Sequence, residues 1–140
     1  MDSMKLEEKI LHVIGGMHVG AVATIAGEKP AVRFMGLRGY DNMILVAGTM
    51  KSTRKVRELK VQPDTAISIW SGVDFSDPYV GISAKAEVHE DHETKKRYWN
   101  PMFEEYFGSI DNPDFVLLLF VAETIEYYAP PMMEPEIWNR

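Results

Sequence analysis

Short apolar runs separated by turn residues dominate this chain and predict a protein built mainly from β-strands. The clearest run is YVGISAKAEV (79–88), in which valine, isoleucine and alanine alternate with small or charged residues. Alternation with a period of two places one set of side chains on the buried face of a sheet and the other set on the opposite face. Other runs have the apolar or β-branched content typical of strands, at residues 18–26, 31–37, 43–47, 65–70 and 115–128.

Helical patterns precede the first strand, separate the third and fourth strands, and precede the last strand. Helices are expected over residues 4–14, from Ser52 or Thr53 to Gln62, from an Asp91 cap through Trp99, and from Pro101 to Phe107. Six closely spaced strands with helices outside them predict a mainly β, α+β fold, a six-stranded antiparallel barrel with flanking helices. The tail over residues 129–140 contains three prolines and is expected to be irregular.

Composition limits the classes of function. A length of 140 residues predicts one domain over residues 1–140. The net charge of −6 argues against a duplex DNA or RNA binder, whose affinity depends on neutralised phosphates. The absence of cysteine excludes disulfides, thiolate metal sites and cysteine nucleophiles. No apolar run approaches the roughly 20 residues of a membrane span, and no signal-peptide pattern is present, so we expect a cytoplasmic protein without membrane contact.

One short segment is basic although the whole chain is acidic. Residues 51–60 contain five Lys or Arg against one Glu, directly after the small-residue corner Ala47-Gly48-Thr49. The N–H groups at a helix start and nearby cations both favour an anion, so this corner is a candidate phosphate site. Lys51 and Lys55 are four residues apart and share one side of the expected helix. A solvated basic helix face is the alternative interpretation.

Arg33 is the unusual residue of the second expected strand. It shares a face with Ala31, Met35 and Leu37, while Val32, Phe34 and Gly36 occupy the other face. An arginine in this position can lay its stem on the sheet and hold its head in solvent. It can also anchor an anion, and the nearby basic segment gives weight to that interpretation.

Other catalytic chemistry has little support in the sequence. His89 and His92 enclose an acidic pair, but the spacing differs from the helical His-Glu-x-x-His zinc pattern, and a solvated polar corner is the favoured interpretation. No metal site is expected. The chain has no Gly-x-Ser-x-Gly elbow, Walker loop or Gly-x-Gly-x-x-Gly motif, and no general acid or base can be named.

The order of these features resembles the pyridoxamine-5′-phosphate-oxidase-like, FMN-binding split β-barrel proteins, in particular their small general-stress-protein branch. The resemblance extends from about Leu6 to Tyr128. It is carried by Arg33-Phe34-Met35, Ala47-Gly48-Thr49, Lys51-Ser52-x-x-Lys55, EVHEDHETKKRYW (87–99) and DNPDFVLLLFVAETIEYY (111–128). Each motif is degenerate, and their order and spacing together carry the similarity.

The resemblance implies a split-barrel homodimer with FMN at the subunit interface. By matching position, the phosphate would be held by Arg33, Lys51, Ser52 and Lys55. An FMN site needs cations and hydrogen-bond donors for the phosphate and an apolar slot for the ring.

The resemblance also implies that the strand backbone at Phe34 and Met35, with Gly48 and Thr49, borders the flavin ring or ribityl chain. Trp99 would approach from the other subunit, or it would be a core aromatic of its own chain. The oxidase proper has a longer C-terminal part that grips pyridoxamine phosphate, so vitamin B6 oxidation is not expected here. Other branches of the fold use the deazaflavin F420 or haem, so the fold does not determine the cofactor.

Three functions remain open at this point. The favoured one is a flavin-dependent oxidoreductase in which FMN accepts a hydride from a nicotinamide nucleotide or a small substrate. The second is a protein that stores or senses FMN without turnover. The third is a structural dimer whose basic segment contacts an acidic partner.

Overall fold

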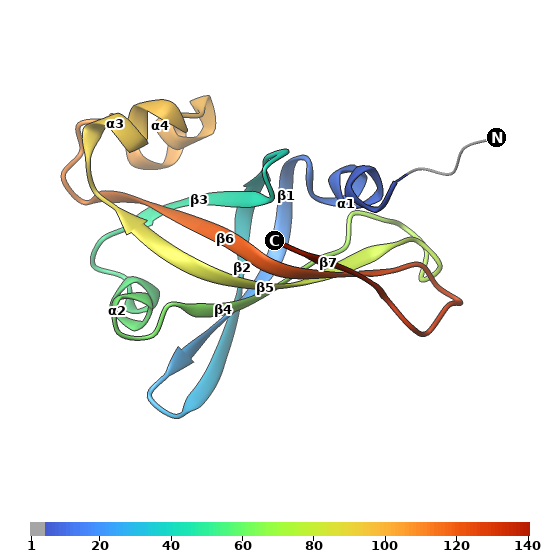
Figure 1. The fold of residues 1–140 in the computed structure, drawn as a ribbon. Coiled ribbons are helices and arrows are strands. Elements are labelled where there is room, and N and C mark those ends of the chain that lie inside the picture. Colours follow the sequence, from blue (N-terminus) through green and yellow to red (C-terminus); the bar gives the residue numbers. More distant parts are fainter. Residues whose placement is uncertain (1–4) are drawn as a thin grey trace.

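The computed structural model describes residues 5–140 and arranges them in alternating helices and strands (Figure 1). Their order is α1 (Leu6–Ile14), β1 (Gly16–Ala26), β2 (Lys29–Gly39), β3 (Ile44–Met50), α2 (Arg54–Val61), β4 (Asp64–Ile69), β5 (Tyr79–His89), α3 (His92–Arg97), α4 (Pro101–Phe107), β6 (Phe115–Tyr128) and β7 (Glu136–Asn139). The six strands expected from the sequence are all present. Helix α1 begins at Leu6, while residue 4 lies outside the described residues.

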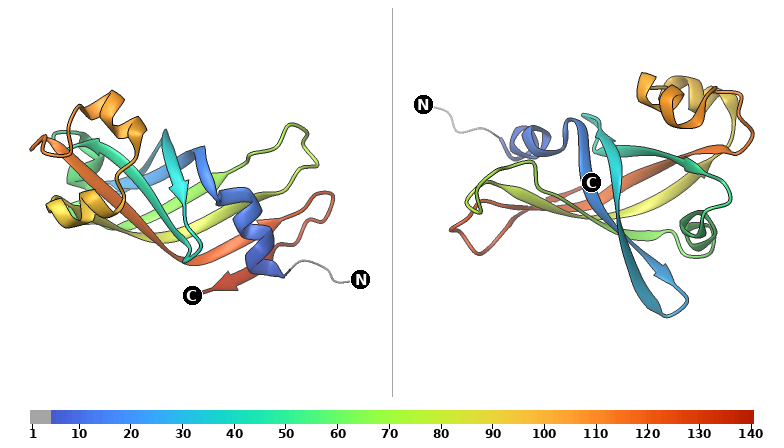
Figure 2. Two further views of the ribbon diagram at one scale, coloured as in Figure 1. Left: turned by 90° about the horizontal axis from the view of Figure 1, so that it is seen from above. Right: turned by 180° about the vertical axis from the view of Figure 1, so that it is seen from behind.

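Six antiparallel strands close into a barrel in the order β3, β2, β1, β4, β5 and β6, with β3 pairing back onto β6. The predicted antiparallel barrel with flanking helices is therefore confirmed. In Figures 1 and 2, α2 lies at one end of the barrel, and the β4–β5 and β6–β7 loops project at the opposite end. Helices α3 and α4 lie together on the outside of β3 and β6.

The barrel is incomplete between β2 and β3. Strands β1 and β2 pair along their whole lengths, and Gly27, with φ of 68°, supplies the left-handed turn between them. Strand β2, however, pairs with β3 only at Arg38 and Gly39. Below this contact β2 separates from β3, and the turn end of the β1–β2 hairpin projects beyond the barrel (Figure 1). Residues 29–37 of β2 therefore border a gap in the barrel wall.

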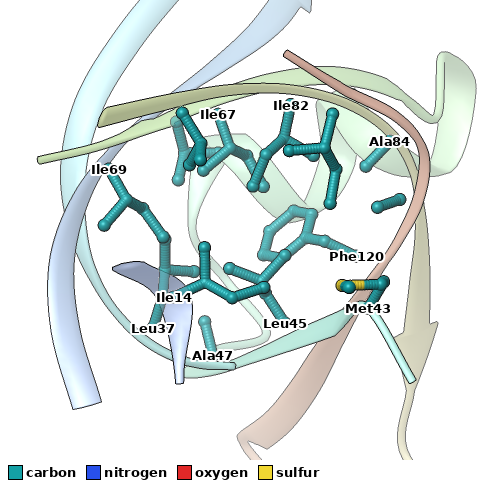
Figure 3. Close-up of a cluster of buried hydrophobic side chains, with 14 of the residues drawn as sticks. Ile14, Leu37, Met43, Leu45, Ala47, Ile67, Ile69, Ile82, Ala84 and Phe120 are labelled. Atoms are coloured by element: carbon teal, nitrogen blue, oxygen red, sulfur yellow. The ribbon is translucent and has the colours of Figure 1, made fainter. Parts of the chain in front are cut away.

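The barrel interior is an apolar core. Side chains such as Leu37, Leu45, Ile67 and Phe120 are fully or almost fully buried and point toward one another (Figure 3). Helix α1 adds Ile14 to the core, and α2 contributes its own apolar side. Burial of these side chains stabilises the barrel by roughly 1.5–3 kcal/mol for each large residue.

A second apolar cluster lies on the outer face of β3 and β6, beneath α3 and α4. Val46 on β3 and Leu119 on β6 pack with Phe103 and Phe115. Phe107 is partly buried and packs against this cluster. Residues 43–47 are apolar throughout because one face of β3 meets the barrel interior and the other meets this cluster. The prediction that this strand is buried on both faces is confirmed.

The expectation of an irregular tail over residues 129–140 is wrong in part, because Glu136–Asn139 forms β7. This strand pairs with the end of β6, opposite Thr124 to Tyr127. Strand β6 extends beyond its pairing with β3, which ends at Val121, and the edge that is left offers free backbone groups that the tail satisfies. Arg140 strengthens the attachment, because its guanidinium donates to the carbonyls of Ala122, Asn42 and Met43.

The side-chain cap predicted from the sequence is present at the start of α3 and is replaced by a different hydrogen bond at the start of α2. Asp91 caps α3 as predicted, because its carboxylate accepts the Thr94 N–H at 2.9 Å. The Thr94 hydroxyl and N–H lower the pKa of Asp91 to about 2. Thr53 occupies the cap position of α2, but its hydroxyl donates to the Met50 carbonyl instead. None of the helices within residues 5–140 is long and apolar enough to span a membrane.

Candidate functional site

Arg33 and the basic segment meet at the gap where β2 leaves the barrel. Helix α2 lies next to this gap, in contact with β1 and β5. Arg33 on β2 forms an ion pair with Glu58 on α2 at 3.4 Å, and its positive charge lowers the pKa of Lys55 on the same helix. The structure therefore brings together the strand residue and the helix residue that the sequence assigned to an anion site.

Arg33 is held by its own chain. One guanidinium nitrogen, Nη1, donates to the Val22 carbonyl at 3.1 Å and to the Thr24 hydroxyl at 2.8 Å. The other, Nη2, lies 3.4 Å from Oε1 of Glu58. The side chain retains 22% exposure, so part of the guanidinium still meets solvent. This differs from the solvent-extended alternative, because the head of the side chain is fixed against α2.

Glu58 is a nearly buried carboxylate within this cationic region. Its side chain is 9% exposed, and Oε1 accepts the Thr24 hydroxyl at 2.7 Å. Oε2 forms an ion pair with Nε of Arg54 at 2.9 Å, without the angle of a well-aligned hydrogen bond. The Thr24 hydroxyl, then Arg54 and Arg33, lower the pKa of Glu58 against the opposing effect of burial. The region already stabilises one anion supplied by the protein.

Lys55 is the cation of this group that has the fewest compensating contacts. Burial lowers the pKa of Lys55, and the positive charge of Arg33 acts in the same direction. Within residues 5–140, no salt bridge joins Lys55 to a carboxylate. A phosphate bound beside Lys55 and Arg33 would supply the counter-charge that both groups favour.

Lys51 and Ser52 lie at the exposed start of the same segment. Lys51 forms an ion pair with Glu90 at 2.8 Å, and this hydrogen bond raises the pKa of Lys51. Lys60 shares the same carboxylate at 3.3 Å. The Ser52 carbonyl accepts a hydrogen bond from Arg57, which leaves the Ser52 hydroxyl exposed at the helix start. Exposed ion pairs of this type are weak, so Lys51 can exchange Glu90 for another anion at small cost.

The residues predicted beside the flavin ring divide between the two faces of β2. Phe34 points outward and is 78% exposed, whereas Met35 points inward and packs against the barrel core. Phe34 belongs to a row of outward-facing residues that crosses the sheet, in which Ala21 pairs with both Phe34 and Ser68, and Ser68 pairs with Gly81. The sequence placed Phe34 on the face opposite Arg33, and the structure agrees.

Gly48 and Thr49 are already covered by their own chain. A Cβ atom at Gly48 would lie 2.9 Å from ring carbons of Phe103, Phe107 and Phe115. Thr49 is 5% exposed. Both residues lie on β3, whose side chains are enclosed, so only backbone groups at this corner can border a bound ligand within one chain.

Trp99 packs in the outer aromatic cluster of its own chain. Its ring makes edge contacts with Phe103 and Phe115, at centroid distances of 5.8 Å and 5.7 Å. This packing corresponds to the alternative in which Trp99 is a core aromatic of its own chain. Within one chain, Trp99 belongs to the α3–α4 cluster, whereas Arg33 and Lys55 meet at α2.

The polar corner at His89 forms local ion pairs. His89 lies 2.8 Å from Glu87 and 3.5 Å from Asp91, while His92 lies 3.5 Å from Asp111. Over the described part of the chain, no three His, Asp or Glu side chains converge on a point that could hold a metal ion.

Sequence reasoning missed three members of the site, namely Glu58, Arg54 and Thr24. Glu58 had a detectable signal, because it is the one acidic residue of the basic segment 51–60. Thr24 had none, since its role depends on the distance between β1 and α2 in the folded chain.

Comparisons with known proteins agree with this architecture. A family model described as "Pyridoxamine 5'-phosphate oxidase" matches residues 6–129. General stress protein 26 of Bacillus subtilis (strain 168) is 29% identical over 126 residues, which is 89% of each chain. The crystal structure of the General Stress Protein 26 from Bacillus anthracis str. Sterne matches with a TM-score of 0.82 and 25% identity, over 98% of this chain and 100% of that chain.

A heme binding protein from Mycobacterium smegmatis has the same fold, with a TM-score of 0.80 and 18% identity over 99% of this chain and 60% of its own. This likeness concerns the fold alone. The family model, in contrast, matches the chain from α1 through the end of β6. The chain therefore belongs to the pyridoxamine 5′-phosphate oxidase family.

Proposed function

We propose that this protein binds FMN and acts as a flavin-dependent oxidoreductase. The observation that carries the proposal is the ion pair of Arg33 with Glu58 of α2, which places Arg33 beside the helix that carries Lys55, a lysine with no salt bridge to a carboxylate within residues 5–140. Membership of the family adds support, because the residues at this gap are those that the resemblance assigns to the flavin phosphate.

The residues of this chain would divide the binding of FMN between them. Arg33 and Lys55 would contact the phosphate through charge-assisted hydrogen bonds, and Lys51 and Ser52 would reach it from the helix start. Glu58 would hold Arg33 and Arg54 in place. FMN, when bound, supplies the redox chemistry, while the protein supplies binding and orientation.

We also propose that the protein acts as a homodimer. The outward row around Phe34 supports this, since Val19, Val32 and Phe34 are 67%, 69% and 78% exposed in a single chain. Contiguous exposed apolar surface of this kind is typical of an interaction site. A second copy would cover this face and bury its apolar side chains.

The test is the absorbance spectrum of the purified protein, repeated after adding FMN and removing the excess. Retained flavin bands, followed by flavin reduction when a nicotinamide nucleotide is added without oxygen, support the oxidoreductase. Bound FMN that this donor leaves oxidised favours storage or sensing. Absorbance bands of haem or F420 in place of flavin bands would identify a different cofactor. A protein that retains none of the three contradicts the proposal.

The same titration tests the site. Arg33→Ala and Lys51→Ala should each weaken FMN binding by several-fold or more, because each removes a charge-assisted phosphate contact. Lys96→Ala is the matched control, since Lys96 is an exposed lysine on α3. Circular dichroism establishes that each variant is folded. Unchanged affinity in both Arg33→Ala and Lys51→Ala would remove the assignment of the phosphate site.

A further inference from the structure

A cleft opens at the end of the barrel opposite α2. It lies between the β4–β5 loop, residues 70–78, and the β6–β7 loop, residues 129–135, which project together at that end (Figures 1 and 2). Its volume is about 450 Å³. Cavities of roughly 300–1,000 Å³ are typical of sites for small molecules.

The cleft has an aromatic floor. Tyr79 at the start of β5 pairs with Tyr128 at the end of β6 in the sheet. Their rings are stacked, with centroids 4.8 Å apart and planes 10° apart. Because the two rings stack on each other, their facing surfaces are occupied, and a further planar ring can lie against an outer face of the pair with little loss of side-chain entropy.

The walls are apolar and uncovered. Phe75 in the first loop is 89% exposed, and Met132 and Met133 in the second loop are 67% and 86% exposed. These three side chains line the cleft together with the tyrosines and with Pro130. Methionine is flexible and polarisable, and it makes favourable contacts with aromatic rings, so this wall can adapt to a flat ligand.

The lining also carries no formal charge. The cleft residues are phenylalanine, serine, tyrosine, proline and methionine, although 26% of the chain is charged. Burial and the nearby Glu126 raise the pKa of Tyr128, so this phenol stays neutral at physiological pH. A charged ligand would lose its hydration here and gain no counter-charge, whereas an uncharged ligand would lose little.

We propose that this cleft binds a small, planar, uncharged aromatic molecule, whose ring extends the Tyr79–Tyr128 stack on an outer face of the pair, between Phe75 and the two methionines. The Ser76 hydroxyl and the tyrosine hydroxyls supply the polar side-chain groups of the lining and can bond one polar substituent. The inference does not depend on flavin binding, because the cleft lies at the opposite end of the barrel from Arg33 and Lys55.

The experiment uses the full chain and two probes that differ in charge, 2-naphthol and naphthalene-2-sulfonate. Binding is followed by NMR of ¹³C-methyl-labelled methionine and by calorimetry. We expect 2-naphthol to bind at least about tenfold more tightly than the sulfonate. Ring currents from the bound naphthol should shift the methyl resonances of Met132 and Met133, while that of Met43 in the barrel core should stay in place.

Met133→Glu introduces a charge into the exposed wall and should weaken 2-naphthol binding at least about tenfold. Val61→Glu is the matched control, because Val61 is similarly exposed, at 87%, on α2. The proposal is overturned if neither probe binds, if both bind equally, or if Met133→Glu leaves binding unchanged. If 2-naphthol does not bind and Met133→Glu converts a dimer into a monomer in sedimentation, the cleft is instead covered by a second copy.

Discussion

At the scale of single residues, Glu58 connects the stability of the fold with the candidate site. Its carboxylate lies between the guanidinium groups of Arg33 and Arg54 and accepts the hydroxyl of Thr24. These contacts tie α2 to the β1–β2 hairpin, which extends beyond the closed barrel. A nearly buried charge is favourable only while its partners are present, so Glu58 and the two arginines should behave as a unit.

Glu58→Gln should lower the free energy of unfolding at pH 7 by about 1–3 kcal/mol, because it removes the charge from these hydrogen bonds. The pKa of Glu58 is lowered in the folded state, so its contribution is present above the unfolded value of roughly 4.3 and is lost as the pH falls through the folded value. Urea unfolding should therefore show that the difference between wild type and Glu58→Gln shrinks on acidification.

Glu105→Gln is the control for this measurement, since Glu105 is exposed on α4 and should change stability little at any pH. A Glu58→Gln protein that is as stable as wild type at pH 7 would contradict the role of this carboxylate. A stability difference that stays constant down to acidic pH would also contradict it.

At the scale of secondary-structure elements, the helices α3 and α4 depend on one glycine of β3. Gly48 has no Cβ, and the rings of Phe103, Phe107 and Phe115 approach its backbone on the outer side. The resemblance assigned Gly48 to the border of the flavin, and this stays a prediction. Within one chain, the absence of a side chain at Gly48 permits close packing of α4 on the barrel.

Gly48→Ala should destabilise the protein by about 1–3 kcal/mol, because the added methyl group overpacks the ring cluster. The cost should be smaller when Phe107→Leu is already present, since a smaller side chain leaves room. Thermal unfolding of the wild type, both single variants and the double variant measures this coupling. Strictly additive changes would show that the Phe107 ring does not limit the space at Gly48.

At the scale of the whole molecule, the outer face of the β2–β1–β4–β5 sheet is uncovered within the described residues. Small residues such as Ala21, Ser68 and Gly81 line a shallow hollow on it, and Val19, Val32 and Phe34 make its β1–β2 edge apolar. This face supports the proposed homodimer, and it lies on the side of β2 opposite to Arg33.

Phe34→Asp should shift the protein from dimer to monomer, because a charge on this face would have to be buried without a partner. Sedimentation velocity over a range of protein concentrations measures the change. Tyr106→Asp is the control, since Tyr106 is 70% exposed on α4, away from this sheet face. If the wild type is monomeric at all concentrations, or if Phe34→Asp remains dimeric, the proposed interface is wrong.

The local pattern of the sequence determined the elements and their order. The alternation in residues 79–88 predicted β5, the apolar run of residues 43–47 predicted a strand buried on both faces, and Asp91 predicted a helix start. These features depend on backbone preferences and on side chains near one another in sequence. A single amino-acid sequence is therefore sufficient to predict them. The basic segment 51–60 and the orientation of Arg33 were also visible at this level.

Only the tertiary structure decided how these residues combine. When the barrel closes, β2 pairs with β3 only at Arg38 and Gly39, so a gap remains between the two strands. Arg33 lies at this gap beside α2 and forms an ion pair with Glu58. Packing of α3 and α4 places Trp99 in the outer aromatic cluster of its own chain, and its approach to a flavin of the other subunit stays a prediction. The strand β7 depends on the free edge of β6, because the tail itself carries a weak strand signal. Contacts between distant segments are set by chain closure and packing density, and no local pattern encodes them.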